Sequence, residues 1–229
     1  MAKSKSFDSY VLALLEGKKY KALKDVYASM RPFDIAEHFE ELSHMNVLLL
    51  FRILPKDLAA ETFVEMDSEL QEALIQGFSD AELAEIVDEL YIDDMVGIIE
   101  EMPANVVARI LKHSSSQTRF LINEILQYPE DSAGSIMTTE FITLRPNMTI
   151  GDAIKRIRER GINSETIDIC YVTDELRHLI GTVTIRTIIL SDESQKIEEV
   201  MERNAISVNT TEDQETAAHL FSKYDLTVL

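Results

Sequence analysis

Apolar side chains recur with a helical period up to about residue 128, in segments of about ten residues that Pro, Asp or Ser separates. Small apolar pairs open equivalent helices at steps of 23, 25 and 24 residues, and these pairs are Ile35-Ala36, Leu58-Ala59, Leu83-Ala84 and Val107-Ala108. Partner helices are expected between and after them, over residues 46–54, 68–78, 93–102 and 115–126. A repeat of this length predicts stacked helical hairpins that form a right- or left-handed α-superhelix.

The pattern changes from Ser135 onward, where short β-branched runs flank amphipathic helices. The order FITL, TIGDAIKRIRERG, TIDICYVTD, LIGTVTI and a final helix predicts a β-α-β-β-α unit. Its opening recurs 64 residues later, and the matched pairs are Met137 with Met201, Ile142 with Ile206, Thr143 with Ser207, Leu144 with Val208, and Ala153 with Ala217. The expected fold class is therefore α plus α/β, an α-superhelix followed by a tandem of two such units.

The second copy reaches Leu229 before its central hairpin, so we expect it to be truncated and expect a continuation to complete its sheet. The predicted domains are an acidic helical domain over residues 1–130, a first β-α-β-β-α domain over 131–196 and the start of a second over 197–229. The longest unbroken apolar runs have six residues, from Tyr10 to Leu15, and five residues, from Val47 to Phe51. A bilayer needs about 20, so a transmembrane domain is expected to be absent from this sequence.

The charge is large, negative and unevenly distributed. The formal net charge is −19 at pH 7, and residues 32–102 contain 19 Asp and Glu against two basic residues, Arg52 and Lys56. Such a surface repels nucleic acid and favours cations or basic partners. The single cysteine, Cys170, excludes an intramolecular disulfide and fits a reducing cytoplasm. No nucleophile–base pairing, glycine-rich phosphate loop or cysteine cluster stands out, so we do not expect an enzyme.

The paired copies, with GTVTIRTII closing the first, resemble CBS domains, which are β-α-β-β-α modules that pair through their sheets and bind adenine nucleotides or ions. The runs PEDSAGSIMTTEFITL and DQETAAHLFSKYDLTVL, together with the acidic helical array upstream, resemble the cytosolic part of the MgtE magnesium transporter family. This resemblance covers nearly the whole chain. The joining of PEDSAGSIMT to an acidic superhelix is the specific part of the match, because a CBS-like repeat occurs in many contexts.

The resemblance implies a magnesium sensor on the cytoplasmic side of the cell membrane. The full-length protein would be a homodimer through its CBS domains and would carry its own transmembrane domain. Two carboxylates about 4 Å apart repel by about 4 kcal/mol at an effective dielectric constant near 20. A divalent cation reverses that interaction, and Mg²⁺ suits the role because it takes oxygen ligands and keeps several waters. The resemblance implies that Mg²⁺ bridges acidic residues of the helical and CBS domains in this way and that the bridged arrangement closes the pore.

The resemblance also assigns candidate Mg²⁺ ligands in the second copy. Asp225 matches a position that supplies a magnesium-binding carboxylate, and Ser222, one turn earlier, matches a position that contributes through its backbone carbonyl. Asp213 and Glu215 match further acidic positions associated with ion binding. The competing interpretation of both Asp213 and Glu215 is a helix N-terminal charge.

Asp93 and Asp94 are the candidates in the helical domain. They are adjacent carboxylates at a loop-to-helix junction with no basic neighbour in sequence, so we predict that they belong to the face that meets the CBS pair. The competing interpretation is that Asp93 caps a helix and that Asp94 is solvated.

A second functional hypothesis is an adenine-nucleotide-binding CBS module whose helical domain docks another protein. CBS clefts commonly hold the ribose through a Gly-x-x-Thr/Ser-x-x-Asp pattern, and the run here is Gly181-Thr-Val-Thr184-Ile-Arg186-Thr187. Thr184 is present and Arg186 could meet a phosphate of ATP or AMP, but Thr187 replaces the Asp. A threonine cannot accept two ribose hydroxyl donors as a carboxylate does.

One basic cluster interrupts the acidic sequence, and its members are Lys155, Arg156, Arg158 and Arg160. They fall on a predicted CBS helix. The alternatives left open are a solvated helix face, pairing with the acidic helical domain, and an approach to lipid headgroups.

Overall fold

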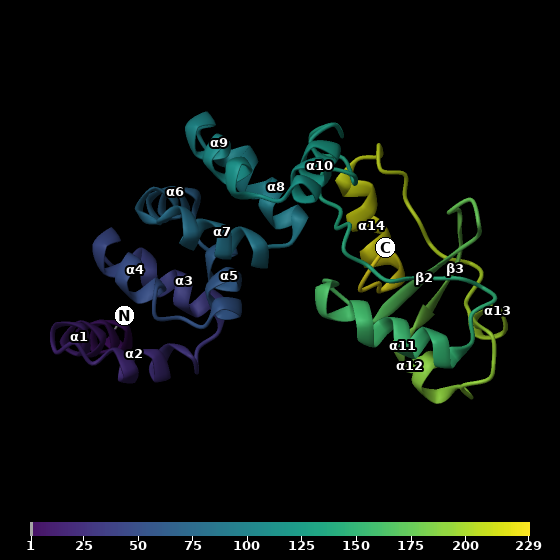
Figure 1. Cartoon of the computed structure of the whole chain (residues 1–229), viewed down its shortest axis with the longest axis horizontal. Coiled ribbons are helices and arrows are strands. Elements are labelled where there is room, and N and C mark those ends of the chain that lie inside the picture. Colours follow the sequence, from purple (N-terminus) through teal and green to yellow (C-terminus); the bar gives the residue numbers. More distant parts are fainter. Residues whose placement is uncertain (1) are drawn as a thin grey trace. The chain divides into compact units, whose positions relative to one another are not determined.

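The computed structural model describes residues 2–229, with side chains from residue 7 on (Figure 1). The chain divides into two compact units, which are described separately here. The first contains the part of the chain up to Leu90 together with Asp94–Phe120, and the second contains Tyr91–Asp93 and Leu121–Leu229. None of the described helices is both long enough and apolar enough to cross a bilayer. The predicted domain limits at residues 130 and 196 stay predictions.

Short helices build the first part of the chain. They are α1 (Ala2–Glu16), α2 (Tyr20–Tyr27), α3 (Pro32–Glu40), α4 (His44–Phe51), α5 (Lys56–Val64), α6 (Ser68–Gly77), α7 (Asp80–Glu89), α8 (Ile92–Glu101), α9 (Ala104–His113) and α10 (Ser116–Ile125). Alternate helices stack, α3 on α5, α5 on α7 and α7 on α9, while α4 packs on α6. These contacts confirm the predicted array of helical hairpins, because each apolar pair of the repeat lies in one of the stacked odd-numbered helices.

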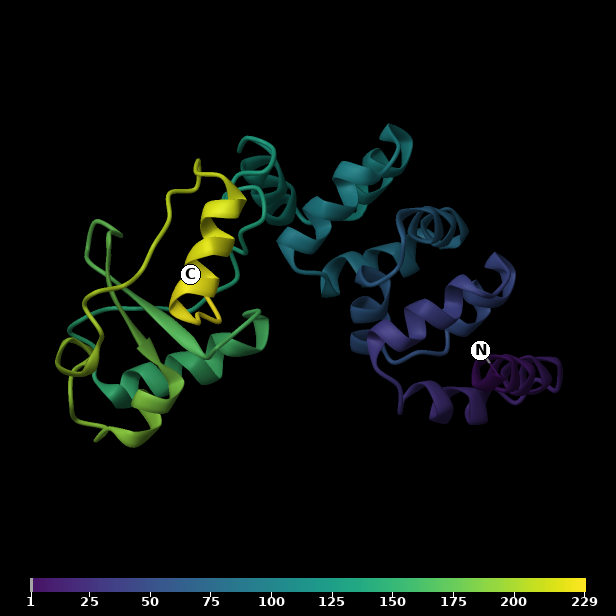
Figure 2. The ribbon, with the colours of Figure 1, turned by 180° about the vertical axis from the view of Figure 1, so that it is seen from behind.

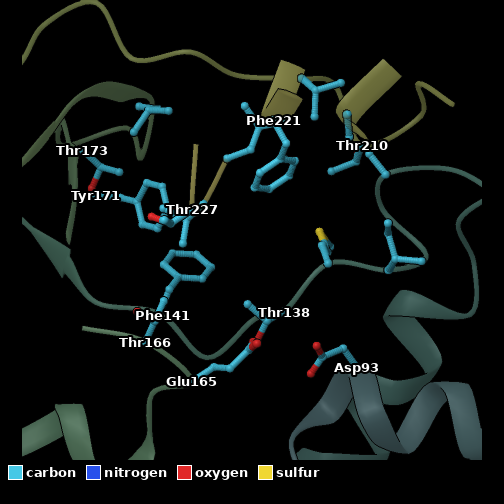
Figure 3. A pocket seen from close by; sticks show the side chains of 18 of the residues that line it. Asp93, Thr138, Phe141, Glu165, Thr166, Tyr171, Thr173, Thr210, Phe221 and Thr227 are labelled. Atoms are coloured by element: carbon cyan, nitrogen blue, oxygen red, sulfur yellow. The ribbon is translucent and has the colours of Figure 1, made fainter. Parts of the chain in front are cut away.

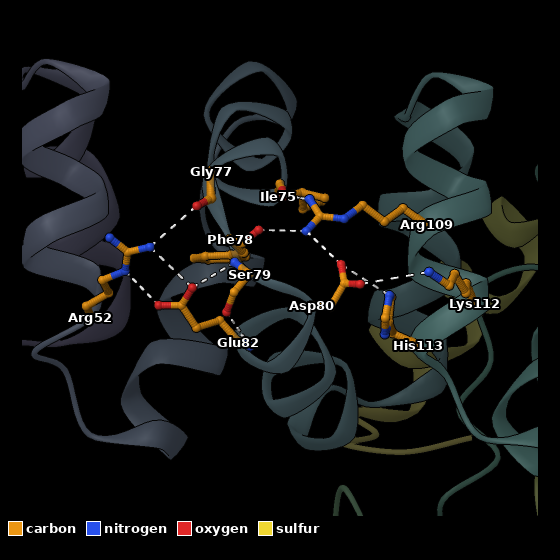
Figure 4. Close-up of polar contacts among 10 residues, drawn as sticks. All are labelled: Arg52, Ile75, Gly77, Phe78, Ser79, Asp80, Glu82, Arg109, Lys112 and His113. Atoms are coloured by element: carbon orange, nitrogen blue, oxygen red, sulfur yellow. Dashed lines mark hydrogen bonds and ion pairs between the residues drawn. The ribbon is translucent and has the colours of Figure 1, made fainter.

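Two arginines from other helices satisfy carbonyl groups at the end of α6 (Figure 4). The Arg52 guanidinium donates to the Gly77 carbonyl at 3.4 Å and to the Glu82 carboxylate at 2.6 Å. From α9, Arg109 donates to the Phe78 carbonyl at 2.6 Å. The last carbonyls of a helix have no intrahelical donor, so these side chains join successive repeats while completing the backbone hydrogen bonding of α6.

The second unit contains the predicted β-α-β-β-α order. Its elements are β1 (Thr143–Leu144), α11 (Ile150–Arg160), a 3₁₀ turn (Gly161–Asn163), β2 (Ile169–Thr173), β3 (Leu179–Thr184) and α12 (Ile185–Leu190). The described sheet has the order β1-β2-β3, with β1 parallel to β2 and β2 antiparallel to β3. Strand residues such as Cys170 and Val172 are buried with Ile150, Ala153 and Ile157 of α11. The predicted fold class is confirmed.

The second copy begins with α13 (Ile197–Val200) and α14 (Gln214–Tyr224). Both ends of α14 are displaced from those of α11 by the predicted 64 residues. The helix α14 lies across the sheet from α11 and α12 (Figure 2). The matched run 206–208, however, is irregular, whereas its counterpart in the first copy is β1. A strand needs a partner for its backbone groups, and β1 has β2, whereas no described strand pairs with 206–208.

A short antiparallel contact, which we term the clasp, joins residues 131–134 to residues 210–214. Ser132 pairs with Asp213, and Gly134 donates its N–H to the Thr210 carbonyl at 2.7 Å. A Cβ atom at Gly134 would lie 2.6 Å from the ring of Tyr128 and 2.7 Å from that carbonyl. The close approach explains the glycine of the PEDSAGS run. The clasp fixes the start of α14 against the segment that leads into the first copy.

Candidate functional site

A cavity of about 510 Å³ lies in the second unit, on the sheet face that α14 covers (Figure 3). Its walls come from the loop before β1, the odd-numbered residues of β2, the β2–β3 hairpin, α14 and the last three residues. The lining residues are Asp93, Ala133, Ile136, Met137, Thr138, Phe141, Glu165, Thr166, Tyr171, Thr173, Arg177, Leu179, Val208, Thr210, Ala217, Phe221, Thr227, Val228 and Leu229. Most of these side chains are apolar or aromatic, as is usual for sites that take a small molecule.

Aromatic rings form one side of the cavity. The rings of Phe141 and Tyr171 meet edge to face with centroids 5.2 Å apart, and Phe221 of α14 also lines the space. Burial raises the pKa of Tyr171, so its hydroxyl stays protonated. Arg177 is the single basic residue among the described lining residues, and it has a left-handed backbone conformation with φ 68°.

Carboxylates gather on another side of the cavity, where Asp93, Thr138 and Glu165 lie near one another (Figure 3). Behind them, Glu140 accepts a hydrogen bond from the N–H of Ile92, the first residue of α8, at 3.1 Å. Its carbonyl accepts the N–H of Glu165 at 3.0 Å. Burial raises the pKa of Glu140, and the charges of Asp93 and Glu165 raise it further, against the bond from Ile92. The fold therefore holds these carboxylates, which we term the junction acids, under mutual repulsion.

The junction acids offer the oxygen ligands that Mg²⁺ prefers, although no group of three or more His, Cys, Asp or Glu residues in the described structure has the geometry of a metal site. Mg²⁺ usually keeps several waters and uses only one or two carboxylates. The arrangement therefore fits a hydrated ion better than a dehydrated one.

The predicted ligands of the second copy fall into two pairs at opposite ends of α14. Asp213 is the N-cap, and its carboxylate accepts the N–H of Glu215 at 2.8 Å. Asp225 is the C-cap with φ 52°, and Ser222 lies in the last helical turn, where carbonyls lack helical donors. At a rise of about 1.5 Å per residue, Asp213 and Asp225 are about 18 Å apart. One ion cannot bridge both pairs.

The two predicted acids of the helical domain are the second and third residues of α8. Asp93 lines the cavity and belongs to the second unit, whereas Asp94 does not line it and belongs to the first. The structure therefore brings Asp93 together with Glu140 and Glu165, which the sequence reasoning did not name. The sequence does single out Glu140, because it is the only charged residue in the run TTEFITL that leads into a buried strand.

The predicted nucleotide residues lie away from the cavity lining. Thr184 is the N-cap of α12, where its hydroxyl accepts the N–H of Thr187 at 3.1 Å, and the hydroxyls of Thr184 and Thr187 lie 2.9 Å apart. Arg186 is exposed. The hydroxyl pair forms a helix cap, and the position where a carboxylate would hold a ribose carries a threonine.

Comparison with known families matches both parts of the chain. The model of the MgtE intracellular N domain matches residues 30–131, and the CBS domain model matches residues 133–193. A magnesium transporter MgtE from Thermus thermophilus is 32% identical over 221 residues, which cover 95% of this chain and 49% of that protein. A magnesium transporter MgtE from Bacillus subtilis is 24% identical over 228 residues, covering 98% of this chain and 51% of that protein.

Solved structures agree. The cytosolic domain of the Mg²⁺ channel MgtE in complex with ATP superimposes with a TM-score of 0.89 at 28% identity, covering 96% of this chain and 90% of that chain. The soluble part of a magnesium transporter superimposes with a TM-score of 0.87 at 24% identity, covering 97% of this chain and 88% of that chain, and shows the same fold.

The helical array, the CBS unit and these matches define the cytosolic part of an ion transporter. The chain spans about half the length of the curated relatives that it matches. It belongs to the MgtE magnesium transporter family, in which it corresponds to the cytosolic part.

Proposed function

We propose that this chain is the Mg²⁺-sensing regulatory region of an MgtE-type transporter or channel. Mg²⁺ bridges acidic residues of the helical domain and of the CBS module, and the bridged state favours the closed pore. The candidate ligands are Asp93 and Asp94 in the helical domain, and Asp213, Glu215, Ser222 and Asp225 in the second copy. The proposal assigns the chain no catalytic activity and no nucleic-acid partner.

The repulsion among the junction acids is the observation that carries this proposal. Glu140 is half-buried beside two further carboxylates, and its raised pKa means that folding disfavours its charged form. A bound cation removes that penalty, so Mg²⁺ is expected to stabilise the folded state. The acidic helices of the first unit also carry an excess of negative charge, with 19 acids against two bases in residues 32–102.

Several weak sites suit a sensor of an abundant ion. Each hydrated Mg²⁺ contributes little by itself, but a protein that binds several ions better in one state than in the other shifts steeply between the two. The ion then acts as a signal to the regulatory region as well as the cargo of the transporter.

The test is a Mg²⁺ titration followed by melting temperature and by small-angle scattering, with NaCl at matched ionic strength as the salt control. Mg²⁺ is expected to raise the melting temperature and to compact the protein. Without Mg²⁺, Glu140→Gln is expected to stabilise the protein at pH 7, because the amide keeps an acceptor for Ile92 and removes the charge. The same variant should reduce the stabilisation by Mg²⁺.

The matched control is Glu124→Gln, which removes one exposed charge from α10 in the same unit. Its Mg²⁺ response should equal that of the wild type. Scattering curves that are identical with and without Mg²⁺, together with an unchanged melting temperature, would refute the sensor proposal. If the two variants lose the same amount of stabilisation by Mg²⁺, the response of the protein to Mg²⁺ depends only on its net charge.

Adenine nucleotide binding is the second candidate function. It is favoured by the aromatic cavity in the CBS module and by the 28% identical MgtE structure in complex with ATP. Calorimetric titration with ATP and with AMP tests it, and the absence of heat with both would remove it. Arg186→Gln should weaken binding if the Thr184–Arg186 run meets the phosphates, whereas Tyr171→Leu should weaken it if the cavity takes the base.

The proposed assembly is a homodimer through the CBS modules, attached to its own transmembrane domain at the cytoplasmic side of the cell membrane. Exposed apolar side chains on α12 support a protein contact there, since Ile189 and Leu190 are 68% and 75% exposed. Ile189→Lys should convert a dimer to a monomer in sedimentation velocity. A monomeric wild type at tens of micromolar would contradict the dimer.

A further inference from the structure

The basic residues of α11 form no salt bridge with the described residues of a strongly acidic chain. Lys155, Arg156, Arg158 and Arg160 make no ion pair with any described residue. Asp and Glu outnumber Lys and Arg by 41 to 22, so four adjacent unpaired cations are unexpected. Their distribution around the helix separates them into two pairs.

The core face of α11 is defined by its buried residues Ile150, Ala153 and Ile157. At 3.6 residues per turn, Arg156 and Arg160 project together from one flank of that face, whereas Arg158 lies on the other flank and Lys155 on the side away from the core.

The two pairs differ in their surroundings. On the side away from the core, Lys155 lies near Asp152, whose pKa is lowered mainly by Thr149 and also by the lysine charge. On the first flank, Glu159 opposes only part of the positive charge, because the pKa of Arg156 is lowered by burial and by the charges of Arg160 and Arg145. The flank of Arg156 and Arg160 therefore carries the uncompensated charge.

Arg145, just after β1, supplies a third guanidinium and is anchored by the end of β2. Its Nη1 donates to the Thr173 carbonyl at 3.1 Å, to the Thr173 hydroxyl at 3.0 Å and to the Asp174 carbonyl. The Nε and Nη2 of Arg145 have no hydrogen-bond partner among the described residues. The carboxylate of Asp174 contacts His178 at 3.0 Å and makes no ion pair with Arg145.

Arg156 has an unsatisfied donor that solvent cannot reach. Its Nε is buried and has no hydrogen-bond partner among the described residues. A buried unpaired donor costs about 1–3 kcal/mol, more when it is charged, and such atoms are few in native proteins. Burial of this atom shows that the Arg156 side chain packs against the fold instead of extending into solvent, so a ligand would meet its terminal Nη groups.

We propose that Arg145, Arg156 and Arg160 form a binding site for a phosphate-type oxyanion, supplied by a lipid headgroup or by free phosphate. A phosphate group offers several acceptor oxygens, and guanidinium groups match it in shape and charge. The distant acids of the chain weaken the attraction little, since charges beyond about 8 Å are screened at physiological ionic strength. Ile162, two residues past α11 and 88% exposed, adds an apolar contact if the source is a membrane.

The test has two arms and uses the whole chain in Mg²⁺-free buffer. In the first, inorganic phosphate is titrated calorimetrically against NaCl at matched ionic strength. In the second, co-sedimentation is measured with vesicles of phosphatidylglycerol in phosphatidylcholine and with vesicles of phosphatidylcholine alone. Saturable binding of phosphate without vesicle binding identifies a free anion, and binding only to the anionic vesicles identifies a headgroup.

The variants separate a built site from general attraction. Arg156→Gln with Arg160→Gln is expected to weaken binding at least tenfold, because two charge-assisted bonds are lost. The matched control is Lys155→Gln with Arg158→Gln, which removes the same charge from the other sides of the same helix and should change affinity by less than about threefold. If the melting temperature of the double variant falls below that of the wild type, the single variant Arg160→Gln, at an exposed position, is tested in its place. Equal losses of affinity in the two double variants, or no saturable binding in either arm, would overturn the proposal.

Discussion

The hydroxyl of Tyr27 in α2 lies 3.1 Å from Nδ1 of His38 in α3, and the other ring nitrogen of His38 lies 3.2 Å from the Asp8 carboxylate in α1. Three helices are thus joined through one imidazole that is 8% exposed. A neutral ring that accepts from Tyr27 and carries its proton on Nε2, toward Asp8, satisfies both neighbours.

This arrangement predicts that the first unit loses stability in mild acid. Burial lowers the pKa of His38, although Asp8 and Glu41 oppose the shift. Because the folded pKa lies below the unfolded value of 6.5, the unfolded chain takes up a proton first. The stability is fully present above pH 6.5 and is lost as pH falls from there through the folded pKa.

The measurement is the free energy of unfolding by urea at several pH values between 8 and 5. His38→Gln should lower that free energy at pH 8 by about 1–3 kcal/mol and should flatten its pH dependence. An equally steep dependence in the variant would assign the effect to other groups.

Glu82 is predicted to stabilise the repeat through two contacts. It pairs with Arg52 and completes the capping box of Ser79, and these interactions lower the pKa of Glu82 to about 2. Its contribution is therefore present above pH 4.5 and is lost as pH falls toward 2. Glu82→Gln should cost about 0.5–1.5 kcal/mol at pH 7, measured by urea unfolding. The exposed Glu69→Gln, in the first turn of α6, is the control and should cost less.

Asp225 is predicted to act through its charge. Asn tolerates the left-handed backbone of this C-cap about as well as Asp does, so Asp225→Asn should leave the unfolding free energy without Mg²⁺ within about 0.5 kcal/mol. The Mg²⁺ concentration at half-maximal response should rise. Asp225→Ala should show the same rise and an added backbone cost of about 1 kcal/mol. A midpoint that does not move in Asp225→Asn would refute the assignment.

Two glycines should respond oppositely to the same substitution. Gly134→Ala forces a methyl group against Tyr128 and the Thr210 carbonyl, so it should destabilise the second unit by about 1–3 kcal/mol. Gly97 lies inside α8 with open space around its Cβ position, so Gly97→Ala should stabilise by about 0.5–1 kcal/mol. Thermal unfolding measures both, and a destabilised Gly97→Ala would contradict the packing described here.

The sequence was sufficient for features that depend on local spacing. Helical periodicity and the step of about 24 residues located the helical hairpins, and the 64-residue offset from α11 located α14. These patterns are visible because each helix must bury one face at regular intervals.

Contacts between distant segments could not be predicted in this way. The pairing of Glu140 with Ile92 joins residues 48 positions apart, and the donation from Arg109 to Phe78 joins residues 31 apart. No spacing rule relates such positions. The expectation that residues 206–208 repeat β1 failed for the same reason. Whether such a run forms a strand depends on a partner strand and not only on its own residues. Asp93 was named from its adjacent charges, but its neighbours Glu140 and Glu165 come from loops that tertiary structure brings together.

The clasp has a mechanical consequence. Ser132 and Asp213 are joined directly, so tension applied beyond α14 reaches the segment that leaves α10 without passing through the first sheet. Its backbone hydrogen bonds form a shortcut across about 80 residues of chain. Force that passes through α14 to the clasp would load these backbone hydrogen bonds before it stretches the chain between Ser132 and Asp213.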